Sequence, residues 1–403
     1  MKIVIFTFCL FINFCSFSQY EIHSNETPSY PELIEILTNL ADSSDVIELF
    51  NMGSSDYGLP IYLCMVNGSR DSLSTFKKAR KETTILFNNA IHPGEPDGIN
   101  AMLIWLKQVS VNPEVLIKLP VIAFIPAYNV GGMMNRSGNS RANQNGPLEY
   151  GFRGNAQNLD LNRDFIKMDS KNAFTFTRIF HAIDPDIFVD NHVSNGADYQ
   201  YTLTYIANLE DRMSPSIKKI THESLLPNLK KALKTNYQID LFPYVDLIGK
   251  TPEQGITSFN DLPRYSMGYA SLFHSIGFTV ETHMLKPFPS RVRATYAFMD
   301  EIIKWTATHK VLIEKARNQA RDYTSSNSYL LSNYNRVEES HDSILFLGYE
   351  HSFPKNKITG LKRLKYDTSA PYKRHIPLMN AFRPLDTISV PEMYFVGRQE
   401  KDV

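Results

Sequence analysis

The sequence has little net charge, little cysteine and no long hydrophobic run, and each shortage argues against a class of protein. Its 403 residues include 42 basic and 42 acidic side chains and three cysteines. Balanced charge is not the basic footprint of a nucleic-acid-binding protein, so we expect no nucleic-acid partner. No run reaches the roughly 20 apolar residues that cross a bilayer. With 43% hydrophobic residues, the composition is globular, with room for one large domain and a smaller one.

The most apolar stretch lies at the N-terminus, where Lys2 precedes the run 3–15. One basic residue followed by a short apolar run is typical of a secretory signal peptide, which we assign to residues 1–19. The alternatives are a transmembrane anchor, for which the run is short, and a lipoprotein signal at Cys15. We therefore expect an exported protein, periplasmic or secreted, without stable membrane insertion after the signal is removed.

Two of the three cysteines, Cys9 and Cys15, lie inside this segment. After its removal Cys64 stands alone, so the remaining chain cannot form an internal disulfide. Cys64 belongs to the apolar run 61–66 and is predicted to be a buried core residue.

Apolar segments with strand and helix periodicity alternate over most of the chain. We expect strands at 46–50, 60–66, 83–88, 121–126, 186–190, 200–206 and 277–281, and helices at 31–40, 99–109, 173–182, 215–235, 265–274 and 294–316. This alternation predicts an α/β protein with three α/β/α layers around a mixed, mainly parallel sheet. The stretch 128–158 is rich in Asn, Gly and Arg and reads as a long loop of the kind that often carries function.

The character of the sequence changes near residue 321. Short apolar runs at 344–348, 358–364, 376–378 and 394–397 are broken by Pro, Lys and Asp. They predict a small β-rich module at 321–403, after a catalytic domain at 20–320.

Three side chains of zinc-ligand type stand next to predicted strands. His92 and Glu95 follow the strand 83–88, and His192 ends the strand that begins at residue 186. A catalytic zinc takes three His or carboxylate ligands and keeps one open position, and open parallel sheets bind ligands at the carboxyl ends of their strands. His-x-x-Glu also occurs at His23 to Glu26, but no strand precedes that copy. We therefore predict a metal site at His92, Glu95 and His192, although His192 alone would read as a structural histidine.

A hydrolytic site also needs a base. Glu281 ends the apolar run 277–281, where an unpaired charge must face a cleft or an ionic partner. The alternative for Glu281 is a salt bridge, and His283 is a rival base.

These residues together resemble the zinc carboxypeptidases of the carboxypeptidase A type. The resemblance rests on His92-x-x-Glu95, on Leu-Asp-Leu-Asn162-Arg163-Asp-Phe, on His192 and on Phe-Thr-Val-Glu281, in that order. It spans about residues 57–316 and identifies the chain as a divergent, bacterial-type member. The resemblance implies one Zn²⁺ per chain, a peptide substrate with a free C-terminus, and removal of C-terminal residues by a zinc-activated water.

The resemblance also implies individual roles. Glu281 would be the general base, and Asn162 with Arg163 would hold the terminal carboxylate of the substrate, which a guanidinium matches in a bidentate fashion. Arg153 would polarise the scissile carbonyl.

Three further residues enter through this resemblance. Arg136 and Arg141 are rivals of Arg153 as the polarising arginine. Tyr265 would close over the substrate, and its neighbour Arg264 is a further candidate for contact with it.

The chain departs from digestive members at His-Pro-Gly-Glu, where they carry an arginine between the ligands. It also has no propeptide-sized segment between the expected signal peptide and the expected strand 46–50. Two competing hypotheses are a zinc deacylase of the aspartoacylase kind and an inactive relative that binds peptides or glycans. The first shares the fold and the ligands. The second predicts loss of a ligand or of the base, and all four residues are present.

Overall fold

The computed structural model of the protein describes residues 24–67, 72–338 and 342–395. The expected signal peptide at 1–19, with Cys9 and Cys15, lies outside these residues, as does His23. Cys64 is a free, fully buried residue, as predicted for a core position. Within the described ranges, no helix combines the length and apolar character needed to cross a membrane.

The centre of the molecule is an eight-stranded sheet in the order β1-β2-β4-β3-β5-β10-β6-β7. Its strands are β1 (Ile47–Ser54), β2 (Pro60–Val66), β3 (Thr84–Asn88), β4 (Val121–Ile125), β5 (Ile187–Ser194), β6 (Leu203–Ala207), β7 (Leu241–Pro243) and β10 (Ile276–His283). The four central strands run parallel, while β1, β2 and β6 bring antiparallel pairs. Every residue of β3, β4 and β5 is buried, as expected for strands covered on both faces.

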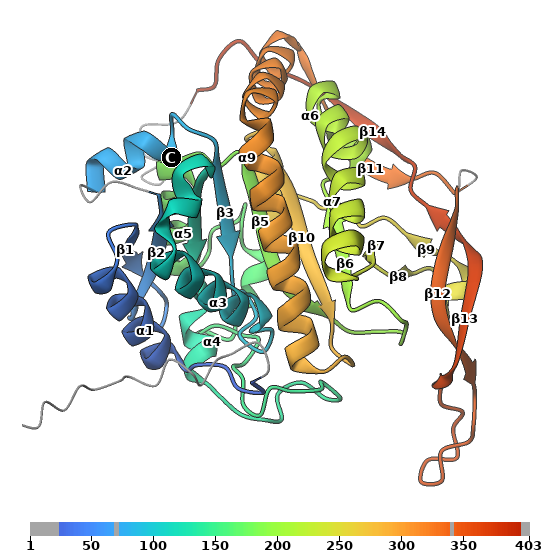
Figure 1. Ribbon diagram of the computed structural model, residues 1–403. Helices are drawn as coiled ribbons and strands as arrows, with labels where there is room; N and C mark the ends of the chain where they lie inside the picture. Colours follow the sequence, from blue (N-terminus) through green and yellow to red (C-terminus); the bar gives the residue numbers. More distant parts are fainter. Residues whose placement is uncertain (1–23, 68–71, 339–341, 396–403) are drawn as a thin grey trace, which may run out of the picture.

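Helices cover both faces of this sheet and complete the predicted three-layer α/β/α fold (Figure 1). The helices are α1 (Tyr30–Ser43), α2 (Ser72–Ala79), α3 (Asp97–Val111), η2 (Pro113–Lys118), α4 (Val130–Met134), η3 (Leu161–Arg163), α5 (Lys171–Ile183), η4 (Glu210–Arg212), α6 (Pro215–Lys219), η5 (Ile220–Leu225), α7 (Leu226–Ala232), η6 (Leu233–Tyr237), η7 (Pro252–Gln254), α8 (Ser266–Ser271) and α9 (Phe288–Ser326). α9 packs beside α3, α6 and α7, while α5 and α8 contact the other side of the sheet.

The predicted order of strands and helices is confirmed, with shifted ends. The strand expected at 200–206 begins only at Leu203, because Tyr199 forms a bridge with Gly348 and the Gln200 amide bonds to Leu347 O at 3.1 Å. Within the loop expected at 128–158, residues 130–134 form the short helix α4. The last helix, α9, continues to Ser326 and so crosses the boundary expected at residue 320.

The C-terminal residues form strands, as expected for a β-rich module. These strands are β11 (Tyr329–Arg336), β12 (Asp342–Ser352), β13 (Lys365–Met379) and β14 (Phe382–Ser389). β11 pairs with β14, whereas β12 and β13 share a sheet with β8 (Asp246–Leu247) and β9 (Ile256–Thr257) from earlier in the chain. Phe346 and Tyr372 pack there against Tyr201 and Phe242.

One of the apolar runs of this β-rich region does not form a strand. Residues 358–364 belong to the loop that joins β12 to β13, because Asn356 accepts hydrogen bonds from the amides of Ile358 and Thr359 and turns the chain. Residues 394 and 395 are not in a strand, and residues 396 and 397 lie outside the described ranges.

Candidate metal and active site

A cleft of about 860 Å³ opens at the carboxyl ends of the central strands. This is where an open parallel sheet gathers loops that follow several strands. Of the residues predicted to act, those that line the cleft are His92, Glu95, Arg153, Asn162, Arg163, His192, Tyr265 and Glu281, and Arg141 lines it too.

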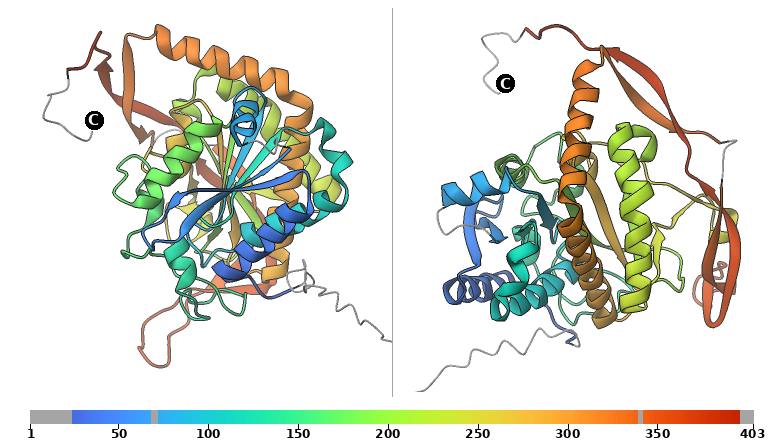
Figure 2. Two further views of the ribbon diagram at one scale, coloured as in Figure 1. Left: turned by 90° about the vertical axis from the view of Figure 1, so that its left-hand side faces the viewer. Right: turned by 45° about the horizontal axis from the view of Figure 1, so that its top comes forward.

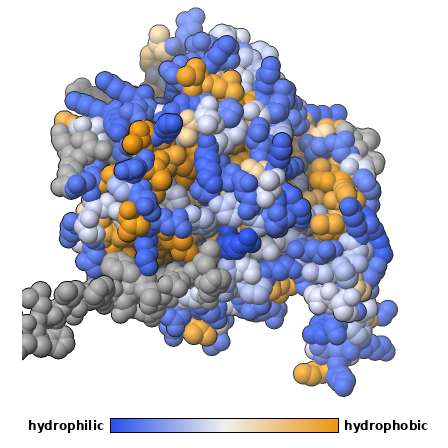
Figure 3. Space-filling model, in the orientation of Figure 1, coloured by the Kyte–Doolittle hydropathy of each residue, from blue (hydrophilic) through white to orange (hydrophobic). Residues whose placement is uncertain are grey.

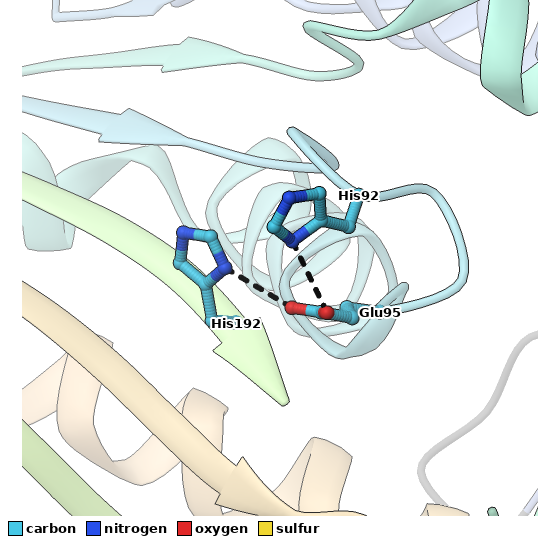
Figure 4. A group of neighbouring side chains, drawn as sticks. All are labelled: His92, Glu95 and His192. Carbon is cyan, nitrogen blue, oxygen red and sulfur yellow. Dashed lines mark hydrogen bonds and ion pairs between the residues drawn. The ribbon is translucent and has the colours of Figure 1, made fainter. Parts of the chain in front are cut away.

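His92, Glu95 and His192 form a buried cluster whose potential ligand atoms all lie within 4.8 Å of one another. The two imidazoles point toward the carboxylate that lies between them (Figure 4). His92 Nδ1 is 3.1 Å from Glu95 Oε1, and His192 Nδ1 is 3.0 Å from Glu95 Oε2. Two nitrogen donors and a carboxylate that converge in this way are the donor set of a three-ligand catalytic zinc site.

The opposite ring nitrogen of each histidine contacts a carboxylate. His92 Nε2 is 3.0 Å from Asp160 Oδ1, and His192 Nε2 is 3.0 Å from Asp190 Oδ2. Metal-binding histidines usually donate their second N–H in this way, which fixes the tautomer and the ring orientation. Each Nε2 is therefore engaged by a carboxylate outside the cluster, while each Nδ1 faces Glu95, the third potential ligand.

A partly buried arginine accompanies the carboxylate of the cluster. Arg141 forms an ion pair with Glu95 and donates to Val193 O at 2.9 Å. Burial raises the pKa of Glu95, but Arg141, His92 and His192 together lower it well below its usual range. Glu95 is therefore ionised, as a metal ligand must be.

Glu281 lies in β10 directly beside His192 of β5 in the parallel register. Its Oε2 is buried without a hydrogen-bond partner among the described residues. Burial raises the pKa of Glu281 to about 8, and the nearby Glu95 carboxylate also raises it, while His192 acts against both. A carboxylate with a raised pKa and an unpartnered oxygen beside a cluster of ligands has the properties of a general base.

Asn162 and Arg163 lie in η3 on the cleft wall. The Arg163 guanidinium stacks on the Tyr265 ring, with its Cζ 4.7 Å from the ring centroid. One of its nitrogens donates to Asn162 O at 2.7 Å. Arg264 lies 5.8 Å from the same ring but is not among the residues that line the cleft.

The three arginines considered for carbonyl polarisation lie in different places. Arg153 is 46% exposed, forms an ion pair with Asp160 at 2.8 Å and reaches to 3.3 Å from His92 Nδ1. Arg141 lies deeper, on Glu95. Arg136 instead donates to Pro28 O and Thr27 O, each at 2.9 Å, and is not part of the cleft lining.

His283, the rival base, is fully buried and stacks on Tyr199 with the ring centroids 4.2 Å apart. It is not part of the cleft lining. Burial lowers the pKa of His283 to about 3, so its ring is neutral near neutral pH.

Two residues of the site, Asp160 and Asp190, were not predicted to act. Asp160 stands in the Leu-Asp-Leu-Asn-Arg run itself, two residues before Asn162. Asp190 stands two residues before His192 in β5, and alternate residues of a strand share a face. That spacing is the signal that could have identified Asp190.

A comparison with protein families agrees with the motifs. Residues 33–193 match the family model described as zinc carboxypeptidase. These residues contain the cluster, Asp160 and the Asn162-Arg163 pair, and Glu281 follows them. The resemblance inferred from the sequence is therefore confirmed. No curated protein matches the sequence.

Two solved structures share the fold. A metallo-carboxypeptidase from Burkholderia cenocepacia is 16% identical, with a TM-score of 0.51 over 70% of this chain and 70% of that chain. Bovine thrombin-activatable fibrinolysis inhibitor, solved in complex with tick carboxypeptidase inhibitor, is 14% identical, with a TM-score of 0.52 over 72% of this chain and 99% of that chain.

Proposed function

We propose that this divergent relative of the zinc carboxypeptidases is a zinc-dependent peptidase that removes residues from the free C-terminus of peptides. The observation that carries the proposal is that the Nδ1 atoms of His92 and His192 converge on the two carboxylate oxygens of Glu95. Glu281, with one unpartnered carboxylate oxygen, lies beside them. This combination provides three ligands and a base in one cleft.

The donor set fits a single zinc ion held by His92, Glu95 and His192. When bound, zinc supplies Lewis acidity, which lowers the pKa of a coordinated water and polarises a carbonyl group. The protein contributes orientation, because the Nε2 atoms of the two histidines are engaged by Asp160 and Asp190.

In this proposal Glu281 accepts a proton from the attacking water and later passes it to the leaving amine. Its buried position raises its pKa, and therefore makes the carboxylate a stronger base than an exposed glutamate. Arg153, which is half-exposed at the rim beside His92, is placed to donate to the scissile carbonyl oxygen as negative charge develops there.

Recognition of the substrate terminus is assigned to Arg163 and Asn162, with Tyr265 closing the site. Stacking on Tyr265 holds the guanidinium plane in place, so less side-chain entropy is lost when a carboxylate binds. A free C-terminal carboxylate is the group that a planar, two-pronged donor recognises best.

The proposal is tested with one peptide in two forms, carrying either a free or an amidated C-terminus. We expect the free form to be hydrolysed and the amidated form to be hydrolysed poorly. Arg163→Gln should lower kcat/KM for the free form roughly 100-fold, since a hydrogen-bonded charge is lost. Arg383→Gln, an exposed change in β14, is the control and should leave hydrolysis unchanged.

Two outcomes would redirect the proposal. Equal cleavage of both peptide forms would reject the exopeptidase assignment while leaving a zinc hydrolase. Hydrolysis of N-acetylated amino acids with no cleavage of either peptide would favour a deacylase of the aspartoacylase kind.

A further inference from the structure

The hairpin of β12 and β13 carries a loop that extends away from the body of the protein. The loop, residues 353–364, lies at the lower right of Figure 1 and projects from the body again in the left-hand view of Figure 2. The carboxyl ends of β3 and β10, where the cleft lies, point toward the same end of the molecule (Figure 1). The loop tip is therefore a point of first contact for any surface that approaches that end.

The tip is a hydrogen-bonded turn that presents apolar side chains. The Asn356 amide donates to Leu361 O at 2.8 Å, and the Gly360 amide donates to Asn356 O at 2.9 Å. Gly360 adopts a φ of +69°, which glycine tolerates without strain. Ile358 is 95% exposed and Leu361 is 71% exposed as a result. Figure 3 shows a hydrophobic spot at this tip within a hydrophilic hairpin.

The same loop is strongly basic in a chain of zero net charge. Its basic residues, all exposed, are Lys355, Lys357, Lys362, Arg363 and, at the start of β13, Lys365. No acidic residue occurs between positions 353 and 365. In the described part of the chain, none of these five side chains forms an ion pair within 4.0 Å, whereas neighbouring basic and acidic residues such as Arg374 and Glu350 do.

We propose that residues 353–365 dock the protein onto an anionic phospholipid bilayer. Two other partners fit the loop less well. Binding of a soluble polyanion would use the basic residues but not the exposed aliphatic ones, and binding in a protein groove would require a larger apolar surface than two aliphatic side chains provide. Aliphatic groups at the apex surrounded by lysines match a bilayer surface, where the apolar tips enter the headgroup boundary and the ammonium groups stay among the phosphates. This inference is independent of the proposed hydrolysis. Docking through the loop would orient the cleft-bearing end of the protein toward the lipid.

The test is co-flotation of the full protein with vesicles of phosphatidylcholine, either pure or with about one third phosphatidylserine. We expect binding to the mixed vesicles that weakens as salt is added, and little binding to the pure ones. The double variant Lys357→Gln/Lys362→Gln should bind roughly 25-fold more weakly, since each basic residue near such a surface contributes about fivefold. Ile358→Ser should weaken binding roughly tenfold.

Matched controls exist elsewhere on the surface. Ile117 is 80% exposed in η2, and Lys118 beside it is also exposed. Ile117→Ser therefore repeats the apolar change, and Lys118→Gln removes one lysine charge, both away from the hairpin. Both controls should bind like the unmodified protein, and the thermal unfolding midpoint should be unchanged in all variants. The proposal is overturned by equal binding of tip and control variants, or by failure to bind mixed vesicles. Binding to soluble polyglutamate that Ile358→Ser leaves intact, without vesicle binding, would overturn it in favour of a polyanion partner.

Discussion

The two histidines of the metal-capable cluster lie in different kinds of structure. His192 is part of β5, and its partner Asp190 is fully buried, where it accepts hydrogen bonds from Asn88 and Ser266. His92 lies in the loop after β3, and its partner Asp160 is 29% exposed on another loop. The site therefore has a strand side, made by β5 and β10, and a loop side.

The two sides differ in the interactions that hold their carboxylates in place. On the strand side, ladder hydrogen bonds and burial hold the carboxylates, and water has little access to them. On the loop side, Asp160 is held by an ion pair with Arg153, which is 46% exposed and therefore screened by solvent. We expect substitutions on the strand side to reduce peptide hydrolysis and zinc affinity more than matching substitutions on the loop side.

The largest expected effect is on the strand side. Glu281→Gln keeps the shape of the side chain but removes the base, so kcat/KM for a free-terminus peptide should fall roughly 1,000-fold while zinc content stays unchanged. Zinc content is measured by elemental analysis of the same preparation. Glu114→Gln, an exposed change in η2, serves as the control. Near-normal turnover of Glu281→Gln would remove Glu281 from the mechanism.

The two sides should also respond oppositely to pH. The folded pKa of Glu281 is about 8, above that of an unfolded glutamate, so its contribution to stability is full below the unfolded pKa and is lost as pH rises through 8. For Asp160, burial raises the pKa, but the interactions with His92 and Arg153 have the larger effect and lower the pKa below its usual range. Its stabilisation is present above the unfolded pKa and is lost as pH falls toward the folded pKa.

These signs are measured by urea unfolding in the presence of a chelator, so that only protein groups contribute. At about pH 9, Glu281→Gln should raise the free energy of unfolding by on the order of 3 kcal/mol, and this gain should vanish by about pH 4. Asp160→Asn should lower it by about 1 kcal/mol at about pH 9. Shifts of the same sign in both variants would contradict the contrast between the two sides.

The third prediction compares the carboxylates behind the two histidines. Asp190→Asn should weaken zinc binding roughly 100-fold, and Asp160→Asn roughly 10-fold, because partners that orient metal ligands contribute in this range and Asp160 is partly screened by water. Competition with a chromophoric chelator measures both affinities. Equal losses of zinc affinity in the two variants would show that the burial of the carboxylate does not determine how much it contributes to zinc binding.

Much of the strand side could be predicted from the sequence. The runs that become β3, β5 and β10 are apolar and end near His92, His192 and Glu281, and parallel strands bring such ends to one edge. Asp190 was missed because its role depends on partners from other strands and helices, Asn88 and Ser266, which a single segment does not reveal.

The loop side and the C-terminal strands were harder to predict. Which arginine lies on Glu95 depends on the path of the long loop, and the loop brings Arg141 there while Arg136 turns toward Pro28. The run 358–364 has strand-like apolar residues, but the turn at Asn356 leaves them in a loop. Local apolar content cannot distinguish a paired strand from an exposed turn.

The most direct test of the central claim is zinc content and peptide hydrolysis measured on one preparation, before chelation, after chelation and after zinc is returned. If the claim holds, we expect about one zinc per chain, loss of hydrolysis with the metal, recovery on its return, and neither zinc nor hydrolysis in His192→Ala. Hydrolysis that persists at full rate without metal, or in His192→Ala, would contradict it.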